Sequence, residues 1–331
     1  LLSQNKMVLD AVLSLECKPF GFYTAQDIAQ ATIENADDGA GDNYQDITTS
    51  ESYGDVPAGL YIKIDQSGAT GSKKLWVAKR SGARYNDTLW YEGEGATSTT
   101  DTLTGGTFAN VADAARSNGN YARYTSGSAG TTAPIGRWNF SIATPPRGEF
   151  RVLAMIRVVE TTFNEYAGMG WGIGYSYGVK TKTPTTALGE VYYPSVNNTW
   201  QILDLGLITI PPVAESDIAG NSAYELRLYF FGNGVDAASR WELDYVFLLP
   251  VDEGVVILDS IAADDILAID AISETPNVFK ISGGLVTDYP SYLGTPFTLG
   301  RGNTRIYFLR DDVPAVTFTV DTKYEPRFLV I

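Results

Sequence analysis

Paired carboxylates are the side chains of this sequence that could carry out acid–base chemistry. Glycoside hydrolysis, for example, needs two acids that face one sugar at a set distance. Two aspartates stand next to each other at three places, but neighbouring residues of a strand point to opposite faces of the sheet. We therefore expect these pairs to be solvated turn residues, and we predict that the chain is not an enzyme. The pairs are Asp37–Asp38, Asp264–Asp265 and Asp311–Asp312.

Other catalytic side chains are scarce. The 331 residues include no histidine, which excludes histidine-containing triads, histidine-ligated metals and imidazole switches within the chain. The single cysteine, Cys17, stands in an apolar run and has no histidine to activate it, so we expect a buried structural thiol. We therefore predict no catalytic residue.

Aromatic residues offer binding rather than reactive chemistry in the stretch 168–177. Large residues alternate there with glycine or serine, so one face of a strand would be bulky and the other nearly bare. If exposed, the bulky face would be a stacking platform for sugar rings, with Trp171, Tyr175 and Tyr177 as its candidate glycan-binding residues. If buried, it would fill a sandwich core and leave the glycines for another backbone to approach. The buried interpretation is the favoured one.

The acidic loop at residues 34–46 could supply hard oxygen ligands for calcium. Its spacing does not match an EF-hand loop, and an ordinary acidic surface loop would contain the same residues. We therefore predict no cofactor and no metal site, with structural calcium kept as the alternative. The acids concerned are Glu34, Asp37, Asp38, Asp42 and Asp46.

The charge balance limits the kinds of partner. The 39 Asp and Glu residues against 24 Lys and Arg residues give a net charge of −15, and basic residues cluster only in pairs such as Lys73–Lys74. Such a chain repels phosphate backbones, so we expect no nucleic-acid partner. No run approaches the ~18 apolar residues of a membrane span, so we expect no membrane insertion.

Most of the chain has the pattern of β-strands. In the stretch 149–159, every second residue from Phe150 to Val158 is apolar. In the stretch 240–250, Trp241 begins a similar apolar series, while Glu242 and Asp244 fall on the opposite face. Six or more such strands separated by turns predict an antiparallel sandwich or jelly roll in the middle of the chain. The short segment 108–119 is expected to form one helical turn or a capping strand.

Length and composition together predict two domains. Residues 92–106 are poor in large apolar side chains and are interpreted as a linker or long loop. The strands before this stretch, including two joined by a hairpin-like loop at 66–72, resemble those after Pro250 more than those between. We therefore predict an all-β fold of two antiparallel sandwiches. An outer, discontinuous domain would comprise residues 1–96 and 251–331, and a jelly-roll-like domain would be inserted at 97–250.

Three stretches of the outer part share a resemblance. The sequences VLSLECKPFGFY at 12–23, TLGRGNTRIYFLR at 298–310 and VDTKYEPRFLVI at 320–331 resemble tail proteins of long-tailed bacteriophages, especially distal-tail and minor tail components. The insert, through NNTWQILDLGLITIPP at 197–212 and RWELDYVFLLP at 240–250, is similar to jelly-roll modules of phage tails and of carbohydrate-binding proteins. The chain lacks a peptidase-like or lysis segment of the kind found at tail tips.

The resemblance implies a virion structural protein, located in the tail and assembled in the host cytoplasm. Its partners would be further copies of itself and other tail proteins, in a ring or tube from which the sandwich projects. The alternative is a glycan- or receptor-binding module that acts through the aromatic platform. The two functions are compatible, because a domain that projects from a tail can reach the host surface.

Overall fold

The computed structural model describes most of the chain, and β-strands make up most of what it describes. Cys17 and the first of the three tail-like stretches, except residues 20–22, fall outside the described part. The described residues are 20–22, 25–35, 42–49, 56–66, 73–100, 106–127, 134–142, 146–160, 168–177, 180–182, 195–210, 224–231, 238–262, 265–273, 275–312, 314 and 316–329.

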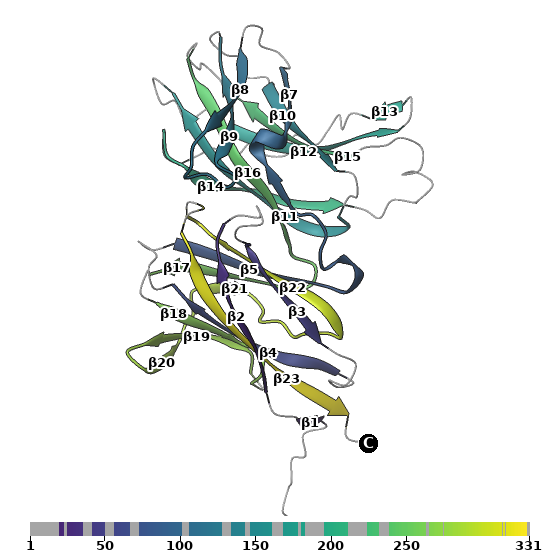
Figure 1. Cartoon of the computed structure of the whole chain (residues 1–331), viewed down its shortest axis with the longest axis vertical. Coiled ribbons are helices and arrows are strands. Elements are labelled where there is room, and N and C mark those ends of the chain that lie inside the picture. The colour runs from purple at the N-terminus through teal and green to yellow at the C-terminus, as the bar shows by residue number, and fades with distance from the viewer. Residues whose placement is uncertain are drawn as a thin grey trace, which may run out of the picture.

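The strands form four antiparallel sheets stacked as two sandwiches, with the inserted sandwich above the outer one in Figure 1. The predicted all-β fold is therefore confirmed. In the outer sandwich, sheet 1 consists of β1 (Phe20–Phe22), β2 (Gln26–Ile33), β23 (Phe318–Leu329), β4 (Val56–Asp65), β18 (Ile266–Asp270), β19 (Asn277–Ser282) and β20 (Leu285–Asp288). Sheet 2 consists of β21 (Tyr292–Gly294), β17 (Val255–Ile261), β5 (Lys73–Ser81), β22 (Gly302–Arg310) and β3 (Tyr44–Thr49).

The inserted sandwich has the strand order of a jelly roll. The chain alternates between its sheets so that β9–β16–β11–β14 lie side by side in one and β10–β15–β12–β13 in the other. Sheet 3 consists of β14 (Gln201–Ile210), β11 (Gly148–Val159), β16 (Arg240–Pro250), β9 (Asn120–Thr125), β8 (Thr107–Ala112) and β6 (Trp90–Glu92). Sheet 4 consists of β13 (Lys180–Lys182), β12 (Gly168–Tyr177), β15 (Tyr224–Phe231), β10 (Pro134–Ile142) and β7 (Thr97–Thr100). Two short 3₁₀ helices, η1 (Gly82–Arg84) and η2 (Gly93–Gly95), lie on either side of β6 in the chain.

The jelly roll replaces the turn of a hairpin in sheet 2. Strands β5 and β17 are antiparallel neighbours, with Ala78 opposite Val255, and the whole insert lies between them in sequence. Four residues separate the end of β16 at Pro250 from this return. The last of them, Gly254, has a φ of 134°, and a Cβ there would lie 2.9 Å from the Cβ of Phe297. The chain thus leaves β16 and re-enters the outer sandwich through a turn that needs glycine.

Two expectations about connections are wrong where the structure describes them. Residues 92–106 were expected to be a linker or long loop, but η2 lies there and β7 pairs with β10 at the edge of sheet 4, while residues 101–105 lie outside the described part. Threonine suits such an edge strand because its β-branched side chain fits a strand that is only half buried. The loop at 66–72 does not close a hairpin either, since β4 pairs in sheet 1 and β5 in sheet 2. Sheet 3 also includes Trp90–Glu92, ahead of the predicted boundary at 97, and the domain limits themselves remain a prediction.

Both faces of sheet 2 are buried. Leu75 and Val77 of β5 pack into the core between sheets 1 and 2. Trp76 and Ala78 point the other way and belong to the same apolar cluster as the core of the jelly roll. A strand that is covered on both sides needs apolar residues on both of its faces, and β5 has them. The two sandwiches therefore share a continuous apolar contact rather than a flexible tether.

A buried arginine reinforces this junction. Arg80 is 0% exposed, and its guanidinium donates hydrogen bonds to Asp87 at 2.6 Å and to the main-chain oxygen of Arg147 at 2.7 Å. It also lies 4.9 Å from the ring centre of Phe150 in the jelly roll. A buried charge is tolerated only when it is paired and hydrogen-bonded, as it is here. The junction is thus specified by a polar network as well as by apolar packing.

Candidate functional site

The outer face of sheet 3 holds two acids that the alternation of β16 places together. Glu242 and Asp244 point away from the core residues Trp241 and Leu243, yet both acid side chains are 0% exposed. A buried carboxylate without partners is strongly disfavoured. Arginine side chains from β9, β11, β16 and the turn after β8 cover and pair the two acids, and these residues form the candidate site.

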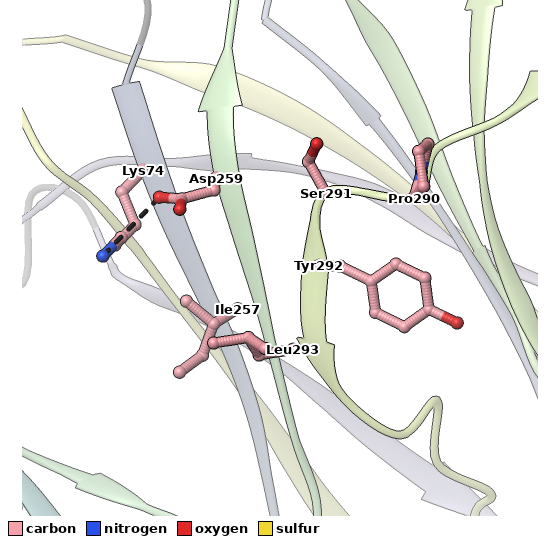
Figure 2. Close-up of a pocket in the computed structure, with 7 residues that line it drawn as sticks. All are labelled: Lys74, Ile257, Asp259, Pro290, Ser291, Tyr292 and Leu293. Atoms are coloured by element: carbon pink, nitrogen blue, oxygen red, sulfur yellow. Dashed lines mark ion pairs between the residues drawn. The ribbon is translucent and has the colours of Figure 1, made fainter.

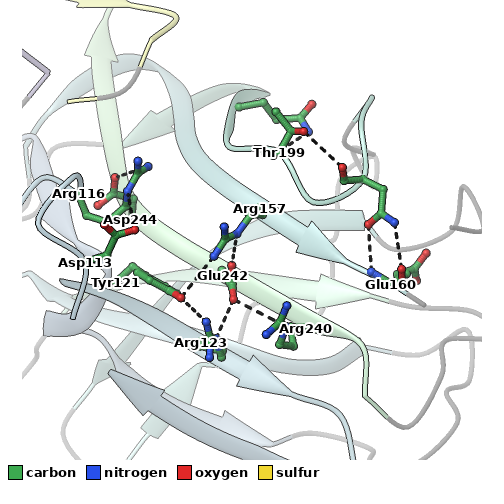
Figure 3. Close-up of polar contacts among 12 residues, drawn as sticks. Asp113, Arg116, Tyr121, Arg123, Arg157, Glu160, Thr199, Arg240, Glu242 and Asp244 are labelled. Carbon is green, nitrogen blue, oxygen red and sulfur yellow. Dashed lines mark hydrogen bonds and ion pairs between the residues drawn. The ribbon is translucent and has the colours of Figure 1, made fainter. Parts of the chain in front are cut away.

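Glu242 is paired with three arginines, which we call the arginine triad: Arg123 of β9, Arg157 of β11 and Arg240 of β16 (Figure 3). The Nε atoms of Arg123 and Arg240 lie 2.7 and 3.9 Å from one oxygen of Glu242, and Arg157 binds the other oxygen. Arg123 and Arg157 also donate hydrogen bonds to the hydroxyl of Tyr121. The triad thus surrounds one negative charge with three positive ones.

Asp244 has a different environment. The Nη1 of Arg116 lies 3.6 Å from its carboxylate, and the main-chain N–H of Ser117 donates a hydrogen bond to it at 3.1 Å. Burial nevertheless raises the pKa of Asp244 to about 7, and the nearby Glu92 and Glu94 add to the rise. The protein therefore favours the protonated form of this acid more than water does.

Trp200 connects the surroundings of the two acids. The guanidinium carbons of Arg116 and Arg157 lie 4.6 and 4.9 Å from its ring centre, within the range of cation–π attraction. Tyr121 meets the ring edge-on, with ring centres 5.2 Å apart. The half-buried indole thus holds one arginine beside each acid.

Sequence reasoning identified only the acids of this site, and only as the polar face of a strand. Residues two apart on a strand share a face. Tyr121 therefore lies on the same face as Arg123, and Arg240 on the same face as Glu242 and Asp244. That spacing could have indicated which residues share a surface. No local pattern links Arg157 of β11 or Trp200, which precedes β14, to the two acids, because those contacts depend on which strands are paired.

The predicted aromatic platform lies on β12 in sheet 4, so its assignment to a strand is confirmed. Trp171 is opposite Leu228 of β15, and Tyr175 is opposite Tyr224. Tyr177 pairs with Lys180 of β13. The side chains of β12 lie outside the described residues, so both the exposed and the buried interpretation of the platform stay predictions.

The expectation that the acid pairs are solvated is wrong for those the structure describes. Asp312 is ion-paired with Arg310 and Asp265 with Lys280, and each acid side chain is 11% exposed. Burial raises the pKa of Asp311. Basic side chains and neighbouring strands cover these acids, which sequence adjacency could not show. Asp37, Asp38 and Asp264 lie outside the described residues.

The acidic loop proposed as a calcium ligand set is only partly described. Both oxygens of Asp46 accept hydrogen bonds from Arg305, at 2.7 and 2.8 Å. Asp42 uses its main-chain oxygen to accept a hydrogen bond from the N–H of Glu34. Within the described residues, no three Asp, Glu or Cys side chains come together as a metal-binding group. The bidentate ion pair makes Asp46 a poor metal ligand.

A second surface feature lies at the margin of the outer sandwich, where β20 ends sheet 1 and β21 ends sheet 2. A pocket of about 310 Å³ lies beside β21, lined in part by Leu293, which is 70% exposed (Figure 2). Leu285 and Val286 of β20 are 68% and 57% exposed. This margin, which we call the β20–β21 margin, therefore presents apolar side chains beside open strand edges.

No family model matches this chain, and no curated protein matches it. Within the described part of the chain, none of the helical segments has the length and apolar character for a membrane crossing.

Several solved structures match weakly. A family 35 carbohydrate-binding module from Clostridium thermocellum is 17% identical, with a TM-score of 0.28 over 49% of this chain and 98% of that one. The CBM22-1 xylan-binding domain of Paenibacillus barcinonensis Xyn10C is 16% identical, with a TM-score of 0.30 over 52% and 99%. A structure of the infectious bursal disease virus Gt strain is 10% identical, with a TM-score of 0.22 over 95% and 83%. At such values these matches do not indicate what this chain binds.

Proposed function

We propose that this protein is a structural subunit of a viral tail, which self-assembles through its outer sandwich and carries the jelly roll as a projection. Its partners would be further copies of itself and other tail proteins, and its location would be the virion after assembly in the host cytoplasm. The β20–β21 margin is the observation that carries this proposal.

The β20–β21 margin combines two features that soluble monomers normally avoid. Strands β20 and β21 are consecutive in the chain, and among the described strands each is the last of its sheet, with one backbone edge unpaired. All four residues of β20 are exposed, and Leu285 and Val286 point to opposite faces because they are adjacent on the strand. Open edges with apolar side chains are usually covered by a partner. A neighbouring subunit would provide that cover.

A second copy of this chain is the partner that the sheets favour. Sheet 2 has its other edge at β3, and β2 lies beside it at the far margin, where the side chain of Gln45 donates a hydrogen bond to the oxygen of Ala29. Each subunit thus has two different edges on opposite margins of the outer sandwich. Contact between unlike edges of successive copies is heterologous, and it closes into a ring when the rotation allows.

Light scattering behind a sizing column tests this proposal directly. A discrete multimer of the 35.9 kDa chain, such as a trimer or hexamer, is expected at micromolar concentration. A monomer at every concentration up to the solubility limit would contradict self-assembly through the outer sandwich.

Glycan binding by the jelly roll is the second candidate function. The observation that favours it is the placement of the aromatic series on β12, one strand from the end of sheet 4, where only the three residues of β13 follow in the described order. Ligand residues near a sheet edge are easier for a sugar chain to reach than those in a central strand. Screening of host-surface glycans with the full chain tests this, with Trp171→Ala as the variant expected to lose binding.

A further inference from the structure

The positive charges of the arginine triad are not balanced by the acid that it surrounds. Arg123, Arg157 and Arg240 form their ion pairs within the described residues with Glu242 alone. Three positive charges around one negative charge leave an excess of two. This excess stands out in a chain whose net charge is −15. A surface of this sign can attract an anion that the rest of the protein repels.

Most hydrogen-bond donors of the triad are uncommitted. A guanidinium has five N–H groups. Within the described residues, Arg123 and Arg157 each donate to Glu242 and to Tyr121, while Arg240 approaches Glu242 only at ion-pair distance. The three side chains are 24%, 22% and 34% exposed in the order Arg123, Arg157 and Arg240. The remaining N–H groups are therefore available on a partly solvent-exposed surface.

The triad is also held in place before any ligand arrives. Glu242 is fully buried beneath the guanidiniums, Tyr121 bridges two of them, and Trp200 stacks on Arg157. Fixing an arginine in this way lowers the entropy that binding would otherwise cost. Planar guanidiniums bind carboxylate and phosphate groups in a bidentate manner. The geometry thus fits an oxyanion better than a neutral hydroxyl-rich surface.

We infer that the outer face of sheet 3 binds the acidic group of an anionic polysaccharide, with the arginine triad as the receptor. Such a site depends on the second candidate function, in which the jelly roll contacts a glycan. It lies on the sheet opposite β12, so it is separate from the predicted aromatic platform. Carboxylate groups of uronic acids and phosphate groups of polyol-phosphate polymers share the required chemistry.

Calorimetric titration of the full chain distinguishes these sources. Oligogalacturonate supplies carboxylates, a glycerol-phosphate oligomer supplies phosphates, and cello-oligosaccharide is the neutral reference. At least one acidic oligomer is expected to bind, more weakly at high salt because exposed charges are screened. Arg240→Gln, the most exposed member of the triad, should weaken that binding about tenfold, as expected for loss of one charge-assisted contact. Lys323→Gln on sheet 1 removes the same charge from a half-exposed side chain and should leave binding unchanged.

The outcomes separate this site from the proposed functions. Failure of both acidic oligomers to bind, or equal weakening by Arg240→Gln and Lys323→Gln, would overturn the arginine-triad site. If a neutral glycan binds and only Trp171→Ala abolishes its binding, the glycan function stands without this site. The mass of the assembled protein is measured separately, so failure here leaves the assembly proposal intact. Unchanged thermal unfolding of each variant confirms that a loss of binding is not a loss of fold.

Discussion

The guanidinium of Arg80 donates a hydrogen bond to the main-chain oxygen of Arg147 at 2.7 Å, across the junction between the two sandwiches. Arg80 belongs to β5 of the outer sandwich, and Arg147 immediately precedes β11 of the jelly roll. The same carbonyl accepts a hydrogen bond from Arg84 at 2.6 Å. Two arginine side chains of the outer sandwich thus hold one main-chain oxygen at the start of the jelly roll, which suits a projection of defined direction.

Removal of Arg80 should destabilise the protein severely. Arg80→Ala removes the buried cation that pairs with Asp87 and one of the two arginine donors to the carbonyl of Arg147, and breaking a buried pair costs about 3–5 kcal/mol. Chemical denaturation measures the change. Arg84→Ala is the matched control, because its side chain is 40% exposed and its loss should cost under about 1 kcal/mol. Similar losses from both variants would show that Arg80 contributes no more than a surface ion pair.

Charge placed on the β20–β21 margin should prevent assembly. Leu293→Lys adds a positive charge to a side chain that is 70% exposed, so the fold should be retained while contact with a second copy is disfavoured. Light scattering should then report a monomer where the unmodified protein forms a multimer. Leu207→Lys, on the 50% exposed side chain of β14 in the jelly roll, should leave the multimer intact. Equal effects of both variants would place the contact elsewhere.

The stability of the fold should depend on the protonation of Asp244. Its folded pKa is raised from 3.8 to about 7, so between these pH values the folded state holds a proton that the unfolded state has lost. The contribution of this acid is therefore most favourable below pH ~4, falls as pH rises, and levels off above pH ~7. At about 1.4 kcal/mol per pKa unit, the total loss is at most about 4 kcal/mol.

Asp244→Asn should remove this dependence. The variant's stability relative to the unmodified protein should increase between pH 4 and pH 7, because the amide cannot ionise. Urea unfolding at several pH values measures the two curves. Parallel curves would show that Asp244 is ionised in the folded protein throughout this range.

Gly254→Ala should disturb the return from the jelly roll to the outer sandwich. Its φ of 134° is unfavourable for any residue with a Cβ, and the added carbon would lie 2.9 Å from the Cβ of Phe297. We expect a loss of about 3 kcal/mol in the free energy of unfolding. Gly95→Ala is the control, since it has nothing within 4 Å of the added carbon. A loss no greater than that of the control would mean that the turn can adjust.

The sequence by itself determined the fold class, the strands and most of the faces they bury. The apolar residues of β16 are buried as predicted, but so are all the other residues from Trp241 to Pro250, and a register shift opposite β11 interrupts the alternation. The same reasoning explains the end of β16 at Pro250 and the return of the chain to the outer sandwich. Alternation is a local property of the chain, so it can be read without knowing which strands are neighbours.

Tertiary structure alone decided how the polar faces are used. Glu242 and Asp244 were expected on a polar face, but arginines from β9, β11 and the turn after β8 bury both acids. Residues 92–106 looked like a linker because edge strand β7 needs few large apolar residues, and only its pairing with β10 shows that it is part of a sheet. These contacts join residues far apart in sequence. The register in which the strands pair cannot be predicted from a local sequence pattern. The candidate site could therefore be identified only from the folded sheets.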